Sequence, residues 1–382
     1  MTHNTARVFI SAAKRTAVAP RNGLFGKMEA ADLAAPVLKE LIAAAGIPGD
    51  KVDQVILGNA LFGGGNPARI AALAAGIDQS VPALTIDSQC CGGLDAIALG
   101  ASLIASRQAH VILAGGLESY SRSPIRVRRP REPHESPVAY SRPAFTPWPD
   151  ADPDMIEAAA ALAEKLCISR DAQQAFAVAS HAKAFAAQLQ LQAREIISVA
   201  GMGQDAFTRV LSPAMCQRLP IIAGNTMHGL TAATIAVEAD AAAAVLLVSE
   251  EMLNKNTSAD RPVEWIGTKS AGGDPQEPGL VPVAVARSLL AYYGQSEKEL
   301  AVVEIMEAFA AQAMAFVDAF SFSPESINPG GGALARGHPI GASGAILAVR
   351  MFHELQKHRV GSSGLVSIAA AGGLGSAALL RI

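Results

Sequence analysis

The sequence predicts an α/β fold made of two similar halves, with a segment inserted into the first. Strands and helices alternate through the first 119 residues, and the same order of elements recurs from residue 263 to the end. Alternation of this kind places helices on both faces of a sheet. We therefore expect a first half at 1–119, completed by a returning strand within 243–262, an insertion at 120–242 and a second half at 263–382.

The first half is expected to contain four strands and three helices. The helical segments space their apolar residues for one buried face, and the strands are short, apolar and bounded by turn residues. Strands are expected at 7–12, 52–58, 82–87 and 110–114, and helices at 30–45, at 66–75 and from 94 onward.

The insertion begins where the composition changes. From 120 to 154 the chain is rich in Pro, Arg and Ser and weakly periodic. A loop of this length inside a compact domain is usually functional or disordered. Helices are expected to resume at 155–166 and 170–189, and a strand at 245–249 is expected to return to the first sheet.

The second half repeats this alternation. We expect strands at 265–267, 300–304, 365–370 and 377–382, and helices at 281–293, 308–319 and 341–355.

The composition is that of a globular protein without a nucleic-acid partner. The chain has 382 residues, is 50% hydrophobic and has a formal net charge of -3. It therefore lacks the positive surplus that would neutralise phosphates. The exception is a basic cluster of Arg122, Arg126, Arg128, Arg129 and Arg131.

The cysteines indicate a reducing compartment. Four cysteines without a metal-type C-x-x-C pair predict neither a disulfide framework nor a metal site. The N-terminal residues lack the apolar region of a signal peptide, and no apolar run suits a membrane span. We expect a cytoplasmic protein that contacts neither membrane nor nucleic acid.

Cys90 lies between the strand predicted at 82–87 and the helix that follows. The first N–H groups of a helix stabilise a thiolate. We therefore expect Cys90 to have a lowered thiol pKa and to act as a nucleophile. The alternative is a packing role, because cysteine is among the most buried residue types.

His338 lies in the second glycine-rich stretch, GGGALARGHPIGASG at 330–344. Pro339 restricts the backbone beside it, and the flanking glycines suit a crowded site better than a solvated loop. A histidine that faces Cys90 from the other half would be the base that activates the thiol.

Two further stretches carry candidate groups. Glu307 lies where a strand gives way to a helix, so it is either catalytic or a buried carboxylate satisfied by backbone amides. The backbone N–H groups near Gly372, together with that of Cys90, are candidates for an oxyanion hole.

These motifs together resemble those of the thiolase superfamily. SVPALTIDSQCCGGLDA resembles the nucleophile segment, with Cys90 at the acylated cysteine, and GGALARGHPIGASG resembles the catalytic histidine motif. EAFA at 307–310 resembles the N-E-A-F motif, and further matches run the whole length of the chain, including VFISAAKRT, GNPARIAALAAG and GGLESYSRSP.

The resemblance implies a layered α/β/α/β/α fold with two mixed five-stranded sheets and an inserted loop domain that binds coenzyme A. It also implies a cytoplasmic acyltransferase of fatty acid metabolism that takes acyl-CoA as substrate and holds no permanent cofactor. The chain would form at least a homodimer, because in the family the strand before the nucleophile pairs across the interface. Whether dimers pair into tetramers stays open.

The residues expected to contact coenzyme A lie in the insertion. Arg218 precedes the AGN turn at 223–225, as an arginine of the family does. His228 and Met155 are the other candidates, and for His228 an ordinary solvated side chain is the alternative.

Two departures from the family pattern bear on the reaction. Met306 stands where the family has the asparagine that holds a water, and Ala369 stands where it has the second, acid/base cysteine. An alanine cannot move a proton to and from the α-carbon. We therefore expect thiolysis to be slower than in an ordinary thiolase by about 10²–10⁴-fold, unless another group replaces that cysteine.

The departures leave three functions open. The chain is either an acyltransferase that passes an acyl group from Cys90 to CoA or a carbon nucleophile, an acyl-CoA-binding protein or complex subunit with little thiolysis, or a decarboxylative condensing enzyme. Glu307, His228 and Cys91 are the candidates for replacing the missing cysteine.

Overall fold

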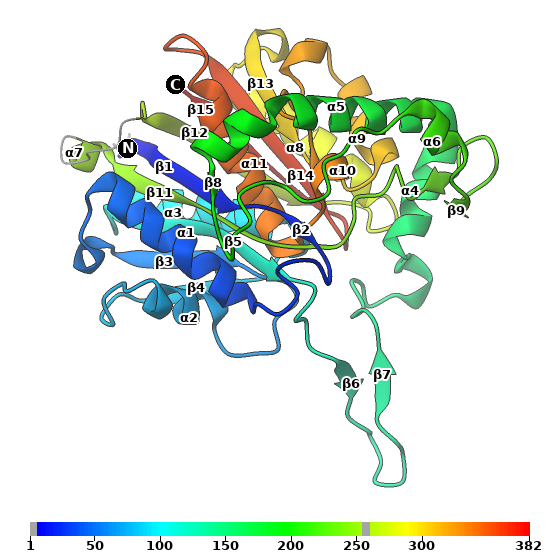
Figure 1. The fold of residues 1–382 in the computed structure, drawn as a ribbon, viewed down its shortest axis with the longest axis horizontal. Coiled ribbons are helices and arrows are strands. Elements are labelled where there is room, and N and C mark those ends of the chain that lie inside the picture. The colour runs from blue at the N-terminus through cyan, green and yellow to red at the C-terminus, as the bar shows by residue number, and fades with distance from the viewer. Residues whose placement is uncertain (1–5, 254–259) are drawn as a thin grey trace.

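The computed structural model describes residues 6–253 and 260–382. The outer parts of the predicted first half, 1–5 and 254–259, lie outside the described residues. Sheets and helices stack in five layers (Figure 1). Within the described ranges, no helix is long and apolar enough to cross a membrane, and no three His, Cys, Asp or Glu side chains gather as a metal site would require.

The first half forms a five-stranded sheet in the order β1-β11-β5-β3-β4, in which β11 (Ala239–Ser249) is the strand that returns after the insertion. Its elements are β1 (Val8–Thr16), β2 (Ala19–Pro20), α1 (Ala30–Ala45), β3 (Gln54–Gly58), α2 (Pro67–Ala74), β4 (Ala83–Ile86), α3 (Gly92–Ala105) and β5 (Val111–Ser119). The predicted strands and helices are confirmed, with boundaries that differ by a few residues. The predicted return of the chain to this sheet is confirmed by β11, which pairs antiparallel with β1 and β5.

The insertion contributes mostly helices and short strands. Its elements are β6 (Arg126–Arg128), β7 (Val138–Tyr140), α4 (Met155–Lys165), α5 (Arg170–Arg194), β8 (Ile196–Ile197), α6 (Pro213–Gln217), β9 (Ile221–Ala223) and β10 (Leu230–Thr231), and the chain returns through β11 (Ala239–Ser249) and α7 (Glu250–Leu253). The β6–β7 hairpin extends away from the body as an arm, which we define as residues 126–140 (Figure 1).

The second half forms a four-stranded sheet in the order β13-β14-β15-β12. Its elements are β12 (Val263–Gly272), α8 (Val281–Tyr293), β13 (Leu300–Ile305), α9 (Ala310–Asp318), α10 (Ala333–Arg336), α11 (Ile340–Leu355), β14 (Ser363–Ala370) and β15 (Leu374–Arg381). The two sheets join where Phe9 and Ile10 of β1 pair with β12.

The expected fifth strand of the second sheet is reduced to a single bridge between Val303 and Ile327. The side chain of Asn328 takes its place: Oδ1 accepts from the backbone N–H of Ile305 at 2.8 Å, and Nδ2 donates to the carbonyl of Ile305 at 3.1 Å. These bonds satisfy the backbone N–H and C=O of Ile305 at the outer edge of β13 in place of a neighbouring strand.

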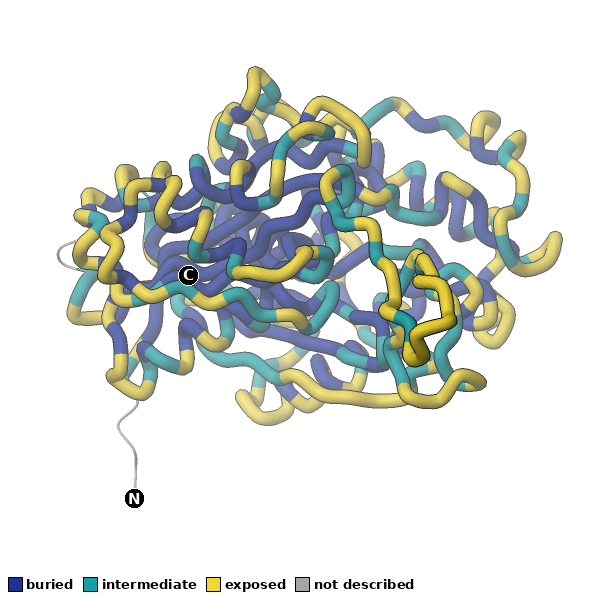
Figure 2. Tube along the Cα trace, turned by 90° about the horizontal axis from the view of Figure 1, so that it is seen from below, coloured by how far each residue is buried: buried dark blue, intermediate teal, exposed yellow. Residues whose placement is uncertain are grey.

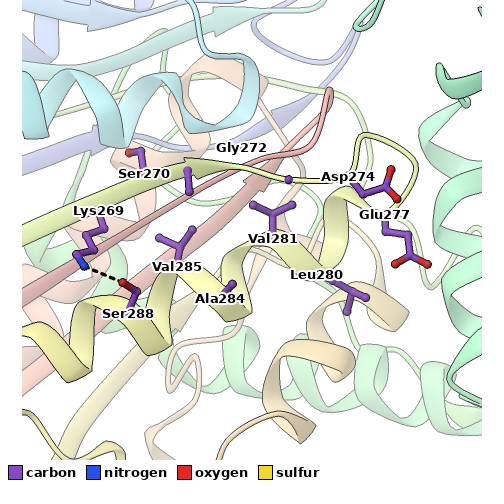
Figure 3. A pocket seen from close by; sticks show the side chains of 12 residues that line it. Lys269, Ser270, Gly272, Asp274, Glu277, Leu280, Val281, Ala284, Val285 and Ser288 are labelled. Atoms are coloured by element: carbon purple, nitrogen blue, oxygen red, sulfur yellow. Dashed lines mark hydrogen bonds between the residues drawn. The ribbon is translucent and has the colours of Figure 1, made fainter. Parts of the chain in front are cut away.

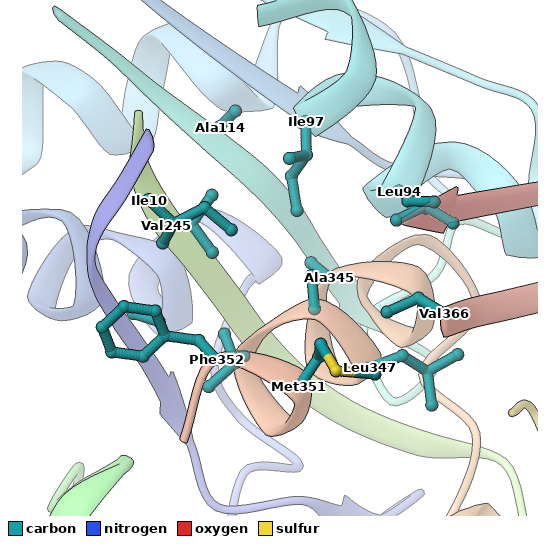
Figure 4. Packing of buried hydrophobic residues seen from close by; sticks show 14 of the residues in the cluster. Ile10, Leu94, Ile97, Ala114, Val245, Ala345, Leu347, Met351, Phe352 and Val366 are labelled. Carbon is teal, nitrogen blue, oxygen red and sulfur yellow. The ribbon is translucent and has the colours of Figure 1, made fainter. Parts of the chain in front are cut away.

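Two helices, α3 and α11, fill the layer between the sheets. Every residue of α11 from Gly341 to Leu355 is buried. Figure 4 shows Leu94 and Ile97 of α3 packed with side chains of α11 and of strands from both halves. Figure 2 shows the buried residues gathered in the middle of the molecule and the exposed residues around its outside.

Glycines let α3 and α11 approach closely. A Cβ built on Gly93 would lie 2.7 Å from the backbone nitrogen of Ala345, and one built on Gly344 would lie 2.6 Å from that of Leu94. Real Cβ atoms do not come so close, so this crossing needs glycine on both helices. Cys90 lies just before α3 and His338 just before α11, and the crossing therefore brings the two residues together.

Candidate active site

A cavity of about 730 Å³ is lined by both halves and by the insertion. Cys90 and Tyr120 come from the first half and its boundary, Met155 comes from α4, and His338 and Ala369 come from the second half. Its walls are mainly apolar, with a few polar groups converging on one region, as is usual for small-molecule sites.

The predicted approach of Cys90 to His338 is confirmed. The Sγ atom of Cys90 lies 3.2 Å from Nε2 of His338, within hydrogen-bond reach. Cys90 is held in a single 3-10 turn at Gln89–Cys91 that leads directly into α3. His338 is held by its own backbone, whose N–H donates to the carbonyl of Val237 at 2.7 Å.

The hydrogen bonds of His338 fix the role of each ring nitrogen. Nδ1 lies 2.7 Å from Oγ of Ser343, and that hydroxyl donates to the carbonyl of Pro339 at 2.9 Å. Since the hydroxyl proton is already used, Nδ1 must carry the hydrogen and donate to Oγ. The lone pair of Nε2 then faces the Cys90 thiol, and the imidazole is oriented as a proton acceptor.

Burial keeps this pair uncharged. It raises the pKa of the Cys90 thiol to about 12, although the backbone N–H groups of Ala371 and Cys90 act in the opposite direction. It also lowers the pKa of His338 to about 4. The lowered thiol pKa expected from the helix start is therefore wrong, because desolvation of the thiolate outweighs the favourable dipole.

Glu118, at the end of β5, supports the site through hydrogen bonds to its buried carboxylate. Its carboxylate accepts from Nδ2 of Asn59 at 2.8 Å, from the N–H of Ala60 at 3.1 Å and from the N–H of Gly341 at 2.9 Å. Burial raises the pKa of Glu118 to about 7 in spite of these donors. The carboxylate thus ties the first half to the start of α11, next to His338.

Glu307 was expected to be catalytic, but it does not line the cavity. Its carboxylate is 1% exposed and accepts from Oγ of Ser180 and Nδ2 of Asn328, both at 2.6 Å. The N–H of Leu334 also donates to it, at 3.3 Å. Burial raises its pKa. Its burial matches the alternative of a satisfied buried carboxylate, but two side chains and only one backbone N–H supply the hydrogen bonds.

The other expected replacements for the second cysteine also lie elsewhere. Cys91 is 1% exposed, and its sulfur faces the carbonyl of Ile368 at 3.7 Å. Nδ1 of His228 lies 3.1 Å from the carbonyl of Ile168, and His228 is absent from the cavity lining.

Of the residues expected to contact coenzyme A, Met155 lines the cavity, while Arg218 and His228 do not. Arg218 caps the short helix α6. The lining instead includes Arg21, Arg126 and Arg142, which sequence reasoning missed as site residues. The basic cluster in the insertion was the available signal, because Arg126 belongs to it.

The two departures from the family pattern differ in position. Ala369 lines the cavity with Cys90, whereas Met306 is 2% exposed and belongs to the core between the sheets. The structure also places Ala371, rather than Gly372, in the cavity wall. The backbone N–H of Ala371 is directed at the Cys90 sulfur.

A second, shallower cleft lies between the end of β12 and α8 (Figure 3). Val281 and Val285 form its floor, and Nζ of Lys269 donates to Oγ of Ser288 at 2.7 Å at one end. It lacks the cysteine and histidine of the first cavity, so the chemistry is expected in the first.

Comparison with known proteins identifies the class. Residues 8–251 match the family model described as thiolase, N-terminal domain, and residues 262–382 match the model described as thiolase, C-terminal domain. The chain belongs to the thiolase family and is a thiolase-type acyltransferase.

Individual relatives cover nearly the whole chain. "Putative acetyl-CoA C-acetyltransferase YhfS" of Bacillus subtilis is 36% identical, over 97% of this chain and 98% of its own. "Putative acetyl-CoA C-acetyltransferase VraB" of Staphylococcus aureus is 34% identical with the same coverage.

Solved structures agree with this assignment. The Bacillus anthracis acetyl-CoA acetyltransferase matches with a TM-score of 0.89 and 29% identity over 100% of both chains. Human mitochondrial 3-ketoacyl-CoA thiolase in complex with CoA matches with the same TM-score and 30% identity over 98% of both. The predicted layered fold is therefore confirmed.

Proposed function

We propose that the protein takes the acyl group of an acyl-CoA onto the Cys90 sulfur and passes it to CoA or to a carbon nucleophile. The observation that supports this most directly is the 3.2 Å contact between Sγ of Cys90 and Nε2 of His338 at the cavity wall. Relatives named for acetyl-CoA and a neighbour solved with CoA support the substrate class.

The acylation step follows from this geometry. Nε2 of His338 accepts the thiol proton as Sγ bonds to the thioester carbonyl carbon. The tetrahedral adduct then expels the CoA sulfur, which takes the proton back from Nε2. The backbone N–H groups of Ala371 and Cys90 act to lower the pKa of the Cys90 thiol, so they favour negative charge on the sulfur as it attacks and as it leaves.

Incubation with short and medium acyl-CoAs should add one acyl group to the protein, on Cys90. Intact-mass measurement followed by peptide mapping detects it. Cys90→Ala should gain no acyl group, whereas Cys167→Ala, at an exposed cysteine outside the cavity, should be acylated like the parent. A parent chain that binds acyl-CoA but stays unmodified would refute the proposal.

One observation supports a second candidate function. Ala369 lines the cavity but has no group that could move a proton at the α-carbon. An enzyme of this kind could acylate Cys90 and condense it with a carbanion made by decarboxylation, or turn over poorly and serve as an acyl-CoA-binding subunit. Rapid acylation of Cys90 without acetoacetyl-CoA thiolysis would favour the condensing enzyme, whereas binding of acyl-CoA without acylation would favour the binding subunit.

The strand before Cys90 supports a homodimer. Within the described ranges, β4 pairs with β3 only and forms the edge of the sheet. Its Leu84 is 39% exposed, and Ile70 and Leu73 of the neighbouring α2 are 57% and 47% exposed. An edge strand flanked by exposed apolar side chains is normally covered. We propose that a second copy covers it, with tetramers left open.

Light scattering should therefore give a dimer mass at micromolar concentration. Leu84→Asp places a charge on the edge and should shift the mass toward the monomer, whereas the same change at Leu189, which is 82% exposed on α5, should not. A monomer mass for the parent would argue against the dimer.

A cytoplasmic location and a role in fatty acid metabolism complete the proposal. All four cysteines are free, as expected in a reducing compartment. Acyl-CoA substrates would connect the enzyme to fatty acid chemistry.

A further inference from the structure

Proton transfer at the α-carbon requires a group that position 369 lacks. In thiolysis the Cys90 sulfur attacks the 3-oxo carbon, the bond between C2 and C3 breaks, and the carbanion at C2 must receive a proton. The incoming CoA thiol must then lose one. Ala369 lines the cavity but has no titratable group, and Glu307, Cys91 and His228 lie outside the lining.

Most titratable side chains in the lining have other partners or cannot exchange a proton. Three ion pairs involve lining residues: Arg21 with Glu238 at 2.7 Å, Arg142 with Asp152 at 3.1 Å, and Glu277 with Lys165. The carboxylate of Asp154 accepts from the backbone N–H of Ile156 at 2.8 Å. Arg126 and Tyr140 lie on the arm. The guanidinium groups remain protonated throughout. Tyr120 is the remaining candidate, and it lines the same cavity as Cys90 and His338.

Tyr120 is positioned by rigid neighbours. It follows β5 directly, and Ser119 before it donates to the carbonyl of Met28 at 3.0 Å. Ser121 after it is bound by Asp240, whose Oδ1 accepts the backbone N–H at 3.0 Å. Bonds on both sides limit the movement of the backbone, which is a requirement for a preorganised catalytic group.

Tyr120 also lies within electrostatic range of the nucleophile. Burial raises the pKa of its phenol, and the charge of a Cys90 thiolate and the carboxylates of Glu238 and Glu118 raise it further. The phenol is therefore fully protonated at neutral pH and available as an acid. Its conjugate base would be strong enough to take the proton of a thiol, whose ordinary pKa is about 8.5.

We propose that Tyr120 is the proton-transfer residue that replaces the missing second cysteine. Its phenol gives a proton to C2 of the departing enolate, which completes acetyl-CoA. The resulting phenolate takes the proton of the incoming CoA thiol, whose sulfur attacks the acyl-Cys90 thioester and displaces the Cys90 sulfur. The displaced sulfur takes back the proton that Nε2 of His338 accepted when Cys90 attacked the 3-oxo carbon. The phenol is regenerated, and no other reactant is needed. The inference rests on the proposed acylation of Cys90.

The test separates proton transfer from acylation. Tyr120→Phe should lower acetoacetyl-CoA thiolysis by about 10²–10⁴-fold, the usual contribution of a general acid or base. The exchange of C2 deuterium from labelled acetyl-CoA into water should fall to the same degree. Acylation of Cys90 should fall far less, because it uses His338.

Two comparisons complete the design. Tyr140→Phe makes the same change at another tyrosine of the cavity lining and should cause a much smaller loss of exchange. Adding Ala369→Cys to Tyr120→Phe should restore most of the exchange, because it returns a proton-transfer group to the wall.

The results distinguish failure of the Tyr120 proposal from failure of the proposed acylation of Cys90. Full thiolysis and exchange in Tyr120→Phe, or equal losses of exchange and acylation, would overturn the role of Tyr120 and leave acylation of Cys90 untouched. A larger loss of exchange in Glu238→Gln than in Tyr120→Phe would assign the proton to Glu238 and overturn it as well. Absence of acylation in the parent would instead refute the proposed function.

Discussion

Replacing His338 with alanine is expected to slow acylation of Cys90 by about 10²–10⁴-fold, the usual contribution of a general base. The reason is that burial holds the Cys90 thiol pKa at about 12. At pH 7 only about one thiol in 10⁵ is then ionised without a base. The variant depends on that fraction, so its rate should rise about tenfold per pH unit. Single-turnover release of CoA at several pH values measures both effects.

The parent should have a different pH profile. Burial lowers the pKa of His338 to about 4, and only the neutral imidazole accepts a proton. Lowering this pKa keeps the accepting form populated as pH falls, so acylation should be constant across neutral pH and decline only near pH 4. A decline centred at about 6.5, the ordinary histidine value, would contradict this, and so would a pH-independent rate in His338→Ala.

Ser343→Ala provides the matched comparison. It keeps both reacting atoms and removes only the hydroxyl that accepts from Nδ1 at 2.7 Å. Its rate should fall less than that of His338→Ala, and its pH profile should keep the shape of the parent's. An equal loss in both variants would mean that orientation, rather than proton transfer, is the main contribution of the imidazole.

The sequence predicted the fold well because its elements have strong local signals. The helix at 30–45 has a regular apolar face and ends at Gly46, whose left-handed conformation at φ 64° stops it. The sequence did not indicate that the second sheet would lack its fifth strand. That loss depends on Asn328, whose side chain satisfies the edge of β13 through contacts between residues 23 positions apart.

The candidate site was predictable where glycines fix the backbone. The stretches around Cys90 and His338 carry the glycines of the α3–α11 crossing, so their approach followed from the motifs. The thiol pKa was not predictable, because desolvation depends on packing from both halves. The positions of Arg218 and Glu307 also depend on how the insertion folds over the core, which local spacing does not specify.

Replacing Arg350 with methionine is expected to destabilise the protein by about 3–5 kcal/mol, the usual cost of removing one partner from a buried ionic cluster. Nη1 of Arg350 lies 2.6 Å from Glu195 of the insertion, and Nη2 pairs with Glu354 and lies 3.7 Å from Glu304. All four side chains are at most 3% exposed. Without the guanidinium, buried carboxylates lose their main positive partner. Urea unfolding at pH 7.5 measures the change in free energy.

Arg7→Met is the matched control. Arg7 also contacts two carboxylates, Glu250 at 2.8 Å and Glu264 at 2.7 Å, but its side chain is 53% exposed. Exposed pairs contribute about 0–1 kcal/mol, so this variant should unfold almost like the parent. Equal losses in Arg7→Met and Arg350→Met would show that burial of the cluster is unimportant.

The loss of unfolding free energy in Arg350→Met should depend on pH, and its direction follows from the pKa values of the buried carboxyl groups. Burial alone would raise the pKa of Glu195, but the charges of Arg350 and Arg15 outweigh it and hold that pKa well below its usual range. Glu304 already has a pKa raised to about 7, because burial dominates. In Arg350→Met burial should dominate at Glu195 too. A carboxyl pKa raised above its unfolded value costs stability as pH rises through it, so the deficit should be largest near pH 8 and shrink toward pH 5. A deficit that grows as pH falls would disprove this account of the cluster.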